Sequence, residues 1–234
     1  MLKAQNITLK IDSREVLKDI SLTASPGDFI CLAGPNGSGK TMLIKTLCGL
    51  LRPFGAVTYN NKDIHTYNTR ELSALLRYLP AQQEAVFNYT SSDIVLMGAN
   101  PALPWWRDYG AADREAAADA MRRARCAEFA GRGVMTLSTG EAQRVFIAQA
   151  ISCKPAVILP DEPTSHLDLK QKDIIFKLFR DIAASGSAVI CATHDIELAK
   201  KYATHICLVR EGRLAVFAPA SLVTEKQINE VYDL

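Results

Sequence analysis

A glycine-rich segment at residues 34–41 carries the clearest chemical signal in this chain. It fits the pattern G-x-x-x-x-G-K-[ST] and lies between the apolar run 29–33 and a stretch with helical spacing. Its glycines allow successive backbone N–H groups to turn onto one anion, and the helix that follows adds its positive dipole end. The side chain of Lys40 can reach terminal phosphates, and the Thr41 hydroxyl can hold Mg²⁺. We therefore expect a triphosphate site, in preference to a simple glycine-rich turn, built from Gly34, Pro35, Asn36, Gly37, Ser38, Gly39, Lys40 and Thr41.

Two adjacent carboxylates, Asp161 and Glu162, follow an apolar run that predicts a strand at 157–159. Acids at such a strand end can hold Mg²⁺ and polarise a water molecule. We expect Asp161 to lie in the shell of the metal and Glu162 to act as general base on the attacking water. The alternative is that both acids only cap a helix.

His194 follows a second buried run at 188–192. A single histidine is usually an ordinary core or surface residue. This one is predicted at the carboxyl edge of a parallel sheet, where ligands bind, and we therefore favour a contact with the γ-phosphate.

The segment Leu-Ser-Thr-Gly-Glu at 137–141 precedes another predicted helix. Ser138 can cap that helix, and Glu141 can complete a capping box. The same helix N-terminus can instead serve as a second anion site, presented outward to the nucleotide of a partner molecule. The residues alone leave both interpretations open.

The elements that position these groups follow from apolar periodicity. Alternation at 2–9 and 16–24, with a short strand at 56–59, predicts a small antiparallel sheet beside the strand, loop and helix of the phosphate segment. A further strand is expected at 75–79. Residues 90–153 carry helical patterns, interrupted at 100–109, with an alanine-rich helix at 111–127. From residue 156 onward, alternating elements predict parallel βαβ units. Their strands are expected at 157–159, 188–192, 205–209 and 214–217, and their helices at 169–184, 195–201 and 225–232.

Composition narrows the function classes. The 234 residues suffice for one full core with an inserted subdomain. The net charge is +2, from 27 basic and 25 acidic residues, and gives no argument for a nucleic-acid partner. Six cysteines without a C-x-x-C pair predict buried thiols in a reducing compartment. No apolar run is long enough to span a bilayer, so we expect a cytoplasmic chain whose contact with a membrane goes through a partner.

Taken together, in order and spacing, the segments 34–41, 137–141 and 157–168 and His194 resemble the ATP-binding subunits of ABC transporters. The resemblance implies an α/β fold, a P-loop NTPase with a RecA-like mixed sheet core, a small antiparallel β subdomain and an inserted helical subdomain. The whole chain, 1–234, would be a single ABC ATPase domain. Residues 1–85 and 154–234 would form the catalytic core with its N-terminal antiparallel sheet, and residues 86–153 the helical subdomain with the signature motif.

The resemblance also implies an ATPase with ATP and Mg²⁺ as cofactors, in which Lys40, Glu162 and His194 are catalytic. In that family two subunits dimerise head to tail and sandwich two ATP molecules. Ser138 and Gly140 would then contact the γ-phosphate held by the opposing copy, residues 165–168 would form the dimer-crossing loop, and His194 would sense the γ-phosphate. Met42 and Glu141 are also expected among the nucleotide-binding residues, and Thr41 and Asp161 at the metal.

Within the family, the segments 92–98, 100–101 and 222–232 look like importer subunits that serve iron chelates, haem and cobalamin, although relatives that handle molybdate share the pattern. This likeness implies a peripheral protein on the cytoplasmic side of the cell membrane. Its partners would be a second copy of itself, integral-membrane permease subunits that meet the helical subdomain near the 80–90 loop, and, indirectly, an external substrate-binding protein.

Several positions depart from the family pattern, among them Ala99, where these importers often carry arginine. Ile11 stands where an aromatic residue stacks on adenine, and Ala81 where a glutamine touches Mg²⁺, so that either Gln82 takes this place or the contact is lost. Thr139 adds a Cβ to the signature, and Pro160 removes an N–H from a central strand. The departures at Ala81, Thr139 and Pro160 motivate an alternative function, a nucleotide-binding subunit with poor hydrolysis and a regulatory or structural role.

Overall fold

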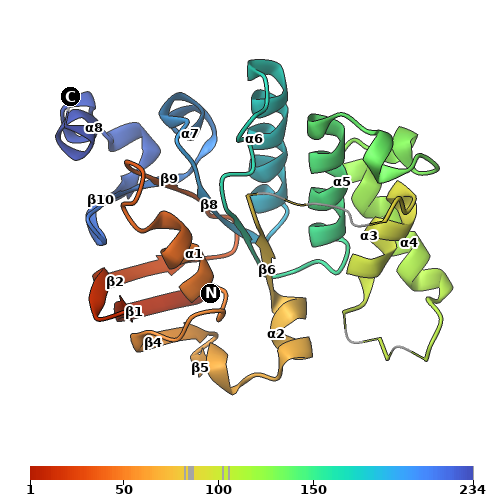
Figure 1. Ribbon diagram of the computed structural model, residues 1–234, viewed down its shortest axis with the longest axis horizontal. Helices are drawn as coiled ribbons and strands as arrows, with labels where there is room; N and C mark the ends of the chain where they lie inside the picture. The colour runs from red at the N-terminus through yellow and green to blue at the C-terminus, as the bar shows by residue number, and fades with distance from the viewer. Residues whose placement is uncertain (82, 84–86, 102, 105, 234) are drawn as a thin grey trace.

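The structure is a computed structural model that describes residues 1–81, 83, 87–101, 103–104 and 106–233. Two sheets and flanking helices form its core half, and a helical subdomain lies to one side (Figure 1). Within the described residues, no helix combines the length and the apolar character that crossing a bilayer requires.

The smaller sheet is antiparallel and has the order β2-β1-β4-β5. Along β1, apolar side chains such as Ile7 and Leu9 are buried while intervening ones face outward, which is the period-two pattern of a half-buried strand. This confirms the predicted antiparallel sheet. Its strands are β1 (Leu2–Ile11), β2 (Arg14–Ala24), β4 (Phe54–Tyr59) and β5 (Lys62–Asp63).

The larger sheet has six strands in the order β10-β9-β3-β8-β7-β6. Neighbours from β9 to β6 are parallel and only β10 pairs antiparallel, so the expected mixed sheet is present. β3 and β8 are buried at every residue, as central strands covered on both faces must be. The strands are β3 (Phe29–Ala33), β6 (Leu76–Leu79), β7 (Val157–Pro160), β8 (Ala188–Ala192), β9 (His205–Arg210) and β10 (Arg213–Pro219).

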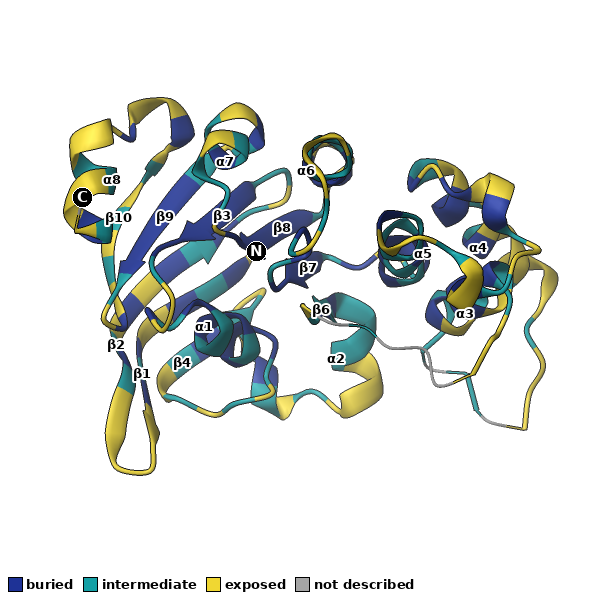
Figure 2. Cartoon of the chain, turned by 45° about the horizontal axis from the view of Figure 1, so that its top comes forward, coloured by how far each residue is buried: buried dark blue, intermediate teal, exposed yellow. Residues whose placement is uncertain are grey.

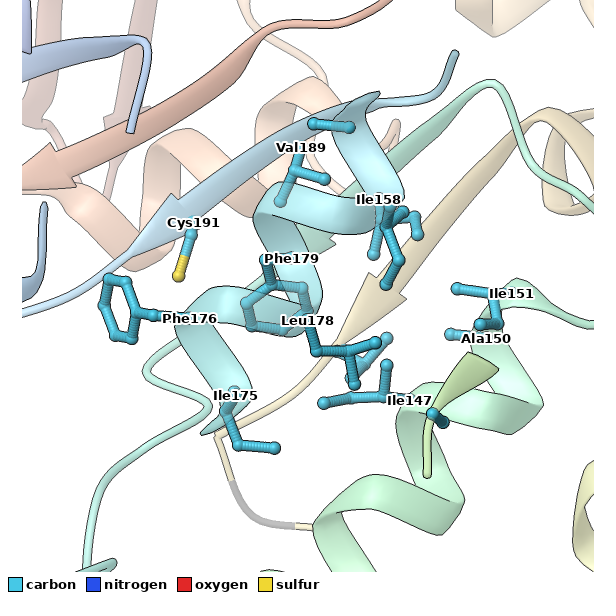
Figure 3. Packing of buried hydrophobic residues seen from close by; sticks show 14 of the residues in the cluster. Ile147, Ala150, Ile151, Ile158, Ile175, Phe176, Leu178, Phe179, Val189 and Cys191 are labelled. Carbon is cyan, nitrogen blue, oxygen red and sulfur yellow. The ribbon is translucent and has the colours of Figure 1, made fainter. Parts of the chain in front are cut away.

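Two apolar layers cover this sheet. Alternate residues of β3 separate them: Phe29 and Cys31 join the layer that contains α6, while Ile30 and Leu32 join the layer formed by α1 and the small sheet. In Figure 3 the side chains of Phe176 and Phe179 from α6 lie between the helix and the strand that carries Cys191. The helices of the core half are α1 (Lys40–Leu47), α2 (Thr69–Leu75), α6 (Leu169–Ala184), α7 (Ile196–Tyr202) and α8 (Glu225–Tyr232).

The helical subdomain packs beside α6, away from α1 (Figures 1 and 2). Ile147 and Ile151 of its helix α5 belong to the same apolar cluster as Leu178 of α6, so the subdomain shares a continuous core with the sheet. The subdomain boundaries at 85/86 and 153/154 stay predictions. Its helices are α3 (Ser91–Ala99), α4 (Ala111–Arg123) and α5 (Thr139–Ile151), and short 3₁₀ turns lie at Ile64–Thr66, Ala127–Phe129, Val134–Thr136 and Ala220–Leu222.

Three predicted details are wrong. The alanine-rich helix ends at Arg123 instead of residue 127, because Arg125 turns into the left-handed region (φ 54°) and lets Cys126 and Phe129 enter the core. The strand expected from residue 75 begins at Leu76, since Leu75 ends helix α2, which the sequence reasoning did not foresee. The strand expected at 157–159 includes Pro160, opposite Leu79 on β6.

Candidate nucleotide-binding site

The phosphate loop connects β3 to α1, and its backbone needs glycine. Gly39 precedes α1 in the left-handed region (φ 107°), and Gly37 has φ 76°. A Cβ on Gly34 would lie 2.1 Å from the carbonyl oxygen of Val209. The local sequence therefore dictates a tight loop that ends at a helix N-terminus, where the first backbone N–H groups have no carbonyl partner within the helix.

Lys40 closes this loop from inside. Its side chain is only 5% exposed, and its ammonium donates to the carbonyl oxygens of Gly34 at 2.8 Å and Pro35 at 3.1 Å. Burial lowers the pKa of Lys40, while the nearby carboxylates of Glu162 and Asp161 act in the opposite direction. The ammonium is thus held inside the loop that is expected to receive phosphates.

Thr41 and Asp161 meet at the floor of the site. The Thr41 hydroxyl donates to Oδ1 of Asp161 at 3.0 Å, and the Tyr78 hydroxyl donates to Oδ2 at 3.4 Å. Asp161 is buried, which raises its pKa, although the hydrogen bond from Thr41 counteracts that shift. The backbone N–H of Asp161 still donates to Leu79 at 2.8 Å, so Pro160 does not interrupt the sheet at this point.

This pair fits Mg²⁺. A hydroxyl and a carboxylate are oxygen ligands of the kind that Mg²⁺ prefers, and Mg²⁺ usually takes few protein ligands and completes its shell with phosphates and water. Among the residues that the structure describes, no group of three or more His, Cys, Asp or Glu is placed to hold a metal alone. A metal at Thr41 and Asp161 would therefore depend on a bound nucleotide.

Glu162 and His194 also come together. Oε1 of Glu162 lies 2.5 Å from Nε2 of His194, and both side chains are partly exposed. Glu162 has φ 48°, a conformation that is uncommon for a residue with a Cβ and that often marks functional sites. Its N–H donates to the carbonyl of Ala192 at 3.0 Å, which fixes it against the end of β8.

The segment 137–141 forms the N-terminus of α5, with the predicted capping box. Glu141 N–H donates to Ser138 Oγ at 3.4 Å, and Ser138 N–H donates to Glu141 Oε2 at 2.8 Å. The hydrogen bond from the Ser138 N–H is the main cause that lowers the pKa of Glu141. Gly140 is buried, and a Cβ there would lie 2.9 Å from the amide group of Gln171. The capping interpretation is confirmed, and the exposed Ser138 leaves the anion-site interpretation open.

The two candidate anion-binding regions lie apart within one chain. α1 and α5 lie on opposite sides of α6 and β6 in both orientations (Figures 1 and 2). The structure therefore brings together Lys40, Thr41, Asp161, Glu162 and His194 and keeps Ser138, Gly140 and Glu141 separate from them.

The remaining predicted residues surround the loop less closely. Ile11 is 38% exposed at the end of β1, paired with Arg14, and Met42 is half-buried in α1. Gln82, the alternative metal contact, lies outside the described residues. A cavity of about 570 Å³ adjoins the loop. Its lining comprises Arg14, Glu15, Val16, Lys18, Pro35, Asn36, Gly37, Ser38, Arg210, Glu211, Gly212 and Asp233.

Sequence reasoning missed two groups of this region. Tyr78 reaches Asp161 only because β6 pairs with β7, a neighbour relation that the local sequence does not contain. Arg210 joins the cavity lining through an ion pair with Asp233 at 2.8 Å. The sequence offered one sign that Arg210 belongs to this region, namely its charge at the end of a buried strand.

Comparison with known proteins gives one consistent family. Residues 17–165 match the family model described as ABC transporter. The hemin import ATP-binding protein HmuV of Gloeobacter violaceus is 35% identical over 231 residues, which cover 95% of this chain and 83% of the relative. An inward-facing ABC transporter assigned to the metal-chelate type superposes with a TM-score of 0.86 at 26% identity, over 100% of this chain and 89% of that one. A dimeric ATP-binding cassette bound to ADP and phosphate, in a post-hydrolysis state, gives 0.77 at 26% identity, over 95% and 100%.

Proposed function

This chain belongs to the ABC transporter family as the ATP-hydrolysing subunit of an importer, and from that premise we propose that it drives the uptake of haem or a related metal chelate. The substrate class is supported by a relative named for hemin import and by a structural neighbour of the metal-chelate type. Iron-siderophore and cobalamin chelates belong to the same proposal. Selectivity itself would lie in the permease and in an external substrate-binding protein.

The observation that carries the hydrolytic mechanism is the contact between Glu162 and His194 at 2.5 Å. Lys40 and the N–H groups of the phosphate loop bind the phosphates of ATP. Mg²⁺, held by Thr41 and Asp161, would neutralise charge on the phosphates as the bond to the γ-phosphate breaks. Glu162 accepts a proton from the attacking water, and His194 orients that carboxylate and faces the γ-phosphate. The products are ADP and phosphate.

The complete site would need a second copy of the chain. Helix α5, whose N-terminus carries Ser138 and Gly140, lies on the other side of α6 from α1 (Figure 1). The exposed Ser138 can therefore contact a nucleotide held by another subunit. In a head-to-tail dimer, the phosphate loop of each copy would face the N-terminus of α5 of the other copy. The similarity to a cassette solved as a dimer supports this arrangement.

The permease would dock between the core sheet and the helical subdomain. A hollow of about 450 Å³ lies there and is lined by Arg77, Tyr78, Leu79, Pro80, Gln83, Met97, Gly98, Phe146, Gln149 and Ala150. Phe87 follows the lining residue Gln83 by four positions in the sequence and is 64% exposed. The centre of its ring lies 5.9 Å from that of the exposed Tyr89. Exposed apolar groups are typical of interaction sites. Such docking would hold the protein on the cytoplasmic side of the membrane.

One observation favours the second candidate, a subunit with poor hydrolysis. Ala81 is exposed and has only a methyl side chain at the position where the family pattern has a glutamine. Thr139 is exposed at the start of α5 and lines a hollow of about 220 Å³ together with Ala81. Pro160 does not add to this argument, because the sheet continues past it through Asp161.

Steady-state ATPase activity of the purified chain with Mg²⁺ tests the two candidates. We expect turnover in the parent protein and in an Ala81→Gln variant, and loss of turnover with retained nucleotide binding in Glu162→Gln. Equal turnover in parent and Glu162→Gln would exclude the mechanism. Turnover that appears only in Ala81→Gln would favour the second candidate. Uptake assays with the cognate permease in vesicles, comparing haem, a ferric siderophore, cobalamin and molybdate, test the substrate class.

A further inference from the structure

Asp195, the residue after His194, connects two elements behind the catalytic pair. Its Oδ1 lies 3.1 Å from the ammonium of Lys172 on α6, and its Oδ2 accepts a hydrogen bond from the Thr164 hydroxyl at 3.3 Å. Its own N–H donates to Thr193 Oγ1 at 3.0 Å. Both oxygens of one carboxylate are therefore used to join separate parts of the chain.

Thr164 belongs to the segment that leaves the active site. Residues 163–168 follow Glu162, and the Ser165 N–H and hydroxyl donate back to the Glu162 carbonyl at 3.2 and 3.0 Å. Thr164 is 2% exposed, and its carbonyl accepts from the Leu167 N–H at 3.2 Å. The path of this segment is thus set by short local hydrogen bonds and by the hydrogen bond from the Thr164 side chain to Asp195.

Two stretches of chain are consequently joined at three successive points. The Glu162 N–H bonds the Ala192 carbonyl, the Glu162 carboxylate contacts His194, and Thr164 bonds Asp195. The ion pair between Lys172 and Asp195 then connects these two stretches to the first turn of α6. The side chains of Phe176 and Phe179 anchor α6 in the apolar core. The side chains of Lys172 and Asp195 are only 22% and 29% exposed, so water weakens this pair less than a surface pair.

We propose that Asp195 and Lys172 are positioning residues for hydrolysis: together they fix the orientation of His194 toward Glu162 and the course of segment 163–168. The proposal rests on the proposed function, in which Glu162 and His194 act on the γ-phosphate and the segment faces a second copy. Removing the connection leaves the phosphate loop unchanged. The loss should therefore fall on kcat and leave ATP affinity intact.

The chain contains a matched control. Lys201 of α7 pairs with Asp173 of α6 at 2.7 Å, and the Tyr202 hydroxyl donates to the same carboxylate at 2.8 Å. This ion pair joins α6 to α7, as Lys172 joins α6 to Asp195 just before α7. Among the described residues, its hydrogen bonds run only between Lys201, Tyr202 and Asp173. A Lys201→Met variant removes a charge pair between the same helices without touching the proposed connection.

The test compares Lys172→Met, Lys172→Arg and Asp195→Asn with the parent and with Lys201→Met, in kcat, KM and nucleotide affinity. We expect kcat to fall about tenfold in Lys172→Met and Asp195→Asn, with nucleotide affinity within about twofold of the parent, because a small misorientation of catalytic groups suffices for such losses. Lys172→Arg should retain most activity, and Lys201→Met all of it. A kcat in Lys172→Met within twofold of the parent, or an equal loss in Lys201→Met, would overturn the proposal.

A second measurement does not depend on turnover. Hydrogen exchange should become faster at the Ser165 and Leu167 amides in Lys172→Met and stay unchanged in Lys201→Met, because only the first variant releases the segment. Unchanged exchange in both would also overturn the proposal. If the parent protein itself lacks turnover while exchange responds as expected, the proposed hydrolytic function fails and the positioning connection stands.

Discussion

Glu162 and His194 lie 32 residues apart in the chain, yet Oε1 of the first meets Nε2 of the second at 2.5 Å. The contact exists because β7 and β8 are parallel neighbours whose carboxyl ends lie at one edge of the sheet. Both residues extend just beyond that edge and are partly exposed. The carboxylate that we propose as general base is therefore already oriented before a ligand binds at the phosphate loop.

Replacing His194 by alanine should lower kcat about 100-fold, at the lower end of the effects of general acid–base groups, with a small change in ATP affinity. Alanine removes the contact that orients Glu162 and leaves the phosphate loop intact. Single-turnover hydrolysis and equilibrium nucleotide binding measure the two quantities separately. His205→Ala is the control, because His205 begins β9, at the end of the sheet opposite the site, and its ring packs against Phe217 of β10. Equal losses in both variants would contradict the assigned role.

Asp161→Asn should raise thermal stability in the presence of EDTA at pH 7 while it abolishes the Mg²⁺ dependence of nucleotide binding. Burial raises the pKa of Asp161 in the folded chain above that of an ordinary aspartate. As the pH rises through the ordinary pKa of aspartate, the unfolded chain loses this proton while the folded chain still holds it. The free energy of unfolding therefore falls between the ordinary pKa and the raised one. At pH 7 the ionised carboxylate is therefore unfavourable. We expect a rise in Tm of a few degrees at most, since about 1 kcal/mol corresponds to ~2–4 °C for a domain of this size.

Asp173→Asn provides a control of opposite sign. Hydrogen bonds from Lys201 and Tyr202 lower the pKa of Asp173, so its ionised form favours the folded chain and its removal should lower Tm. Differential scanning calorimetry of both variants measures the pair. A lower Tm for Asp161→Asn in EDTA would refute the view that this carboxylate is kept for function at the expense of stability.

Ser138→Ala should lower both stability and turnover. Loss of the cap on α5 costs about 1 kcal/mol, or ~2–4 °C in Tm. Asn68→Ala removes an equivalent capping box on α2 and should lower Tm by a similar amount with turnover unchanged. Turnover that falls to the same extent in both variants would show that Ser138 contributes only through the cap.

Ile11→Tyr should strengthen ATP binding. Ile11 is exposed on the β1–β2 hairpin opposite Arg14, which lines the cavity beside the phosphate loop. An aromatic ring there can stack on adenine, and such stacking contributes about 0.5–1.5 kcal/mol, or roughly a twofold to tenfold gain in affinity. Isothermal titration with ATP measures the gain, and inorganic tripolyphosphate, which lacks the base, should bind equally to both proteins. An equal gain in affinity for tripolyphosphate would show that the substitution acts on phosphate binding, which would contradict stacking on adenine.

Local chemistry made several elements predictable from the sequence. The spacing of glycine, lysine and threonine at 34–41 predicts a phosphate loop, because the glycines permit the tight backbone and the lysine and threonine side chains can contact phosphate and metal. The continuous apolar runs at β3 and β8 and the amphipathic pattern of α6 gave element bounds that the structure reproduces. The motifs in order also indicated the family.

Tertiary structure decided what depends on neighbours. The end of α4 at Arg123 is set by the burial of Cys126 and Phe129, which outweighs the helix propensity of the residues around them. The contact of Tyr78 with Asp161 and the connection from Asp195 to Lys172 follow from which elements lie side by side. A sequence records the periodicity of each element separately, whereas the order of strands and the helix that covers them result from burying all the apolar faces at once.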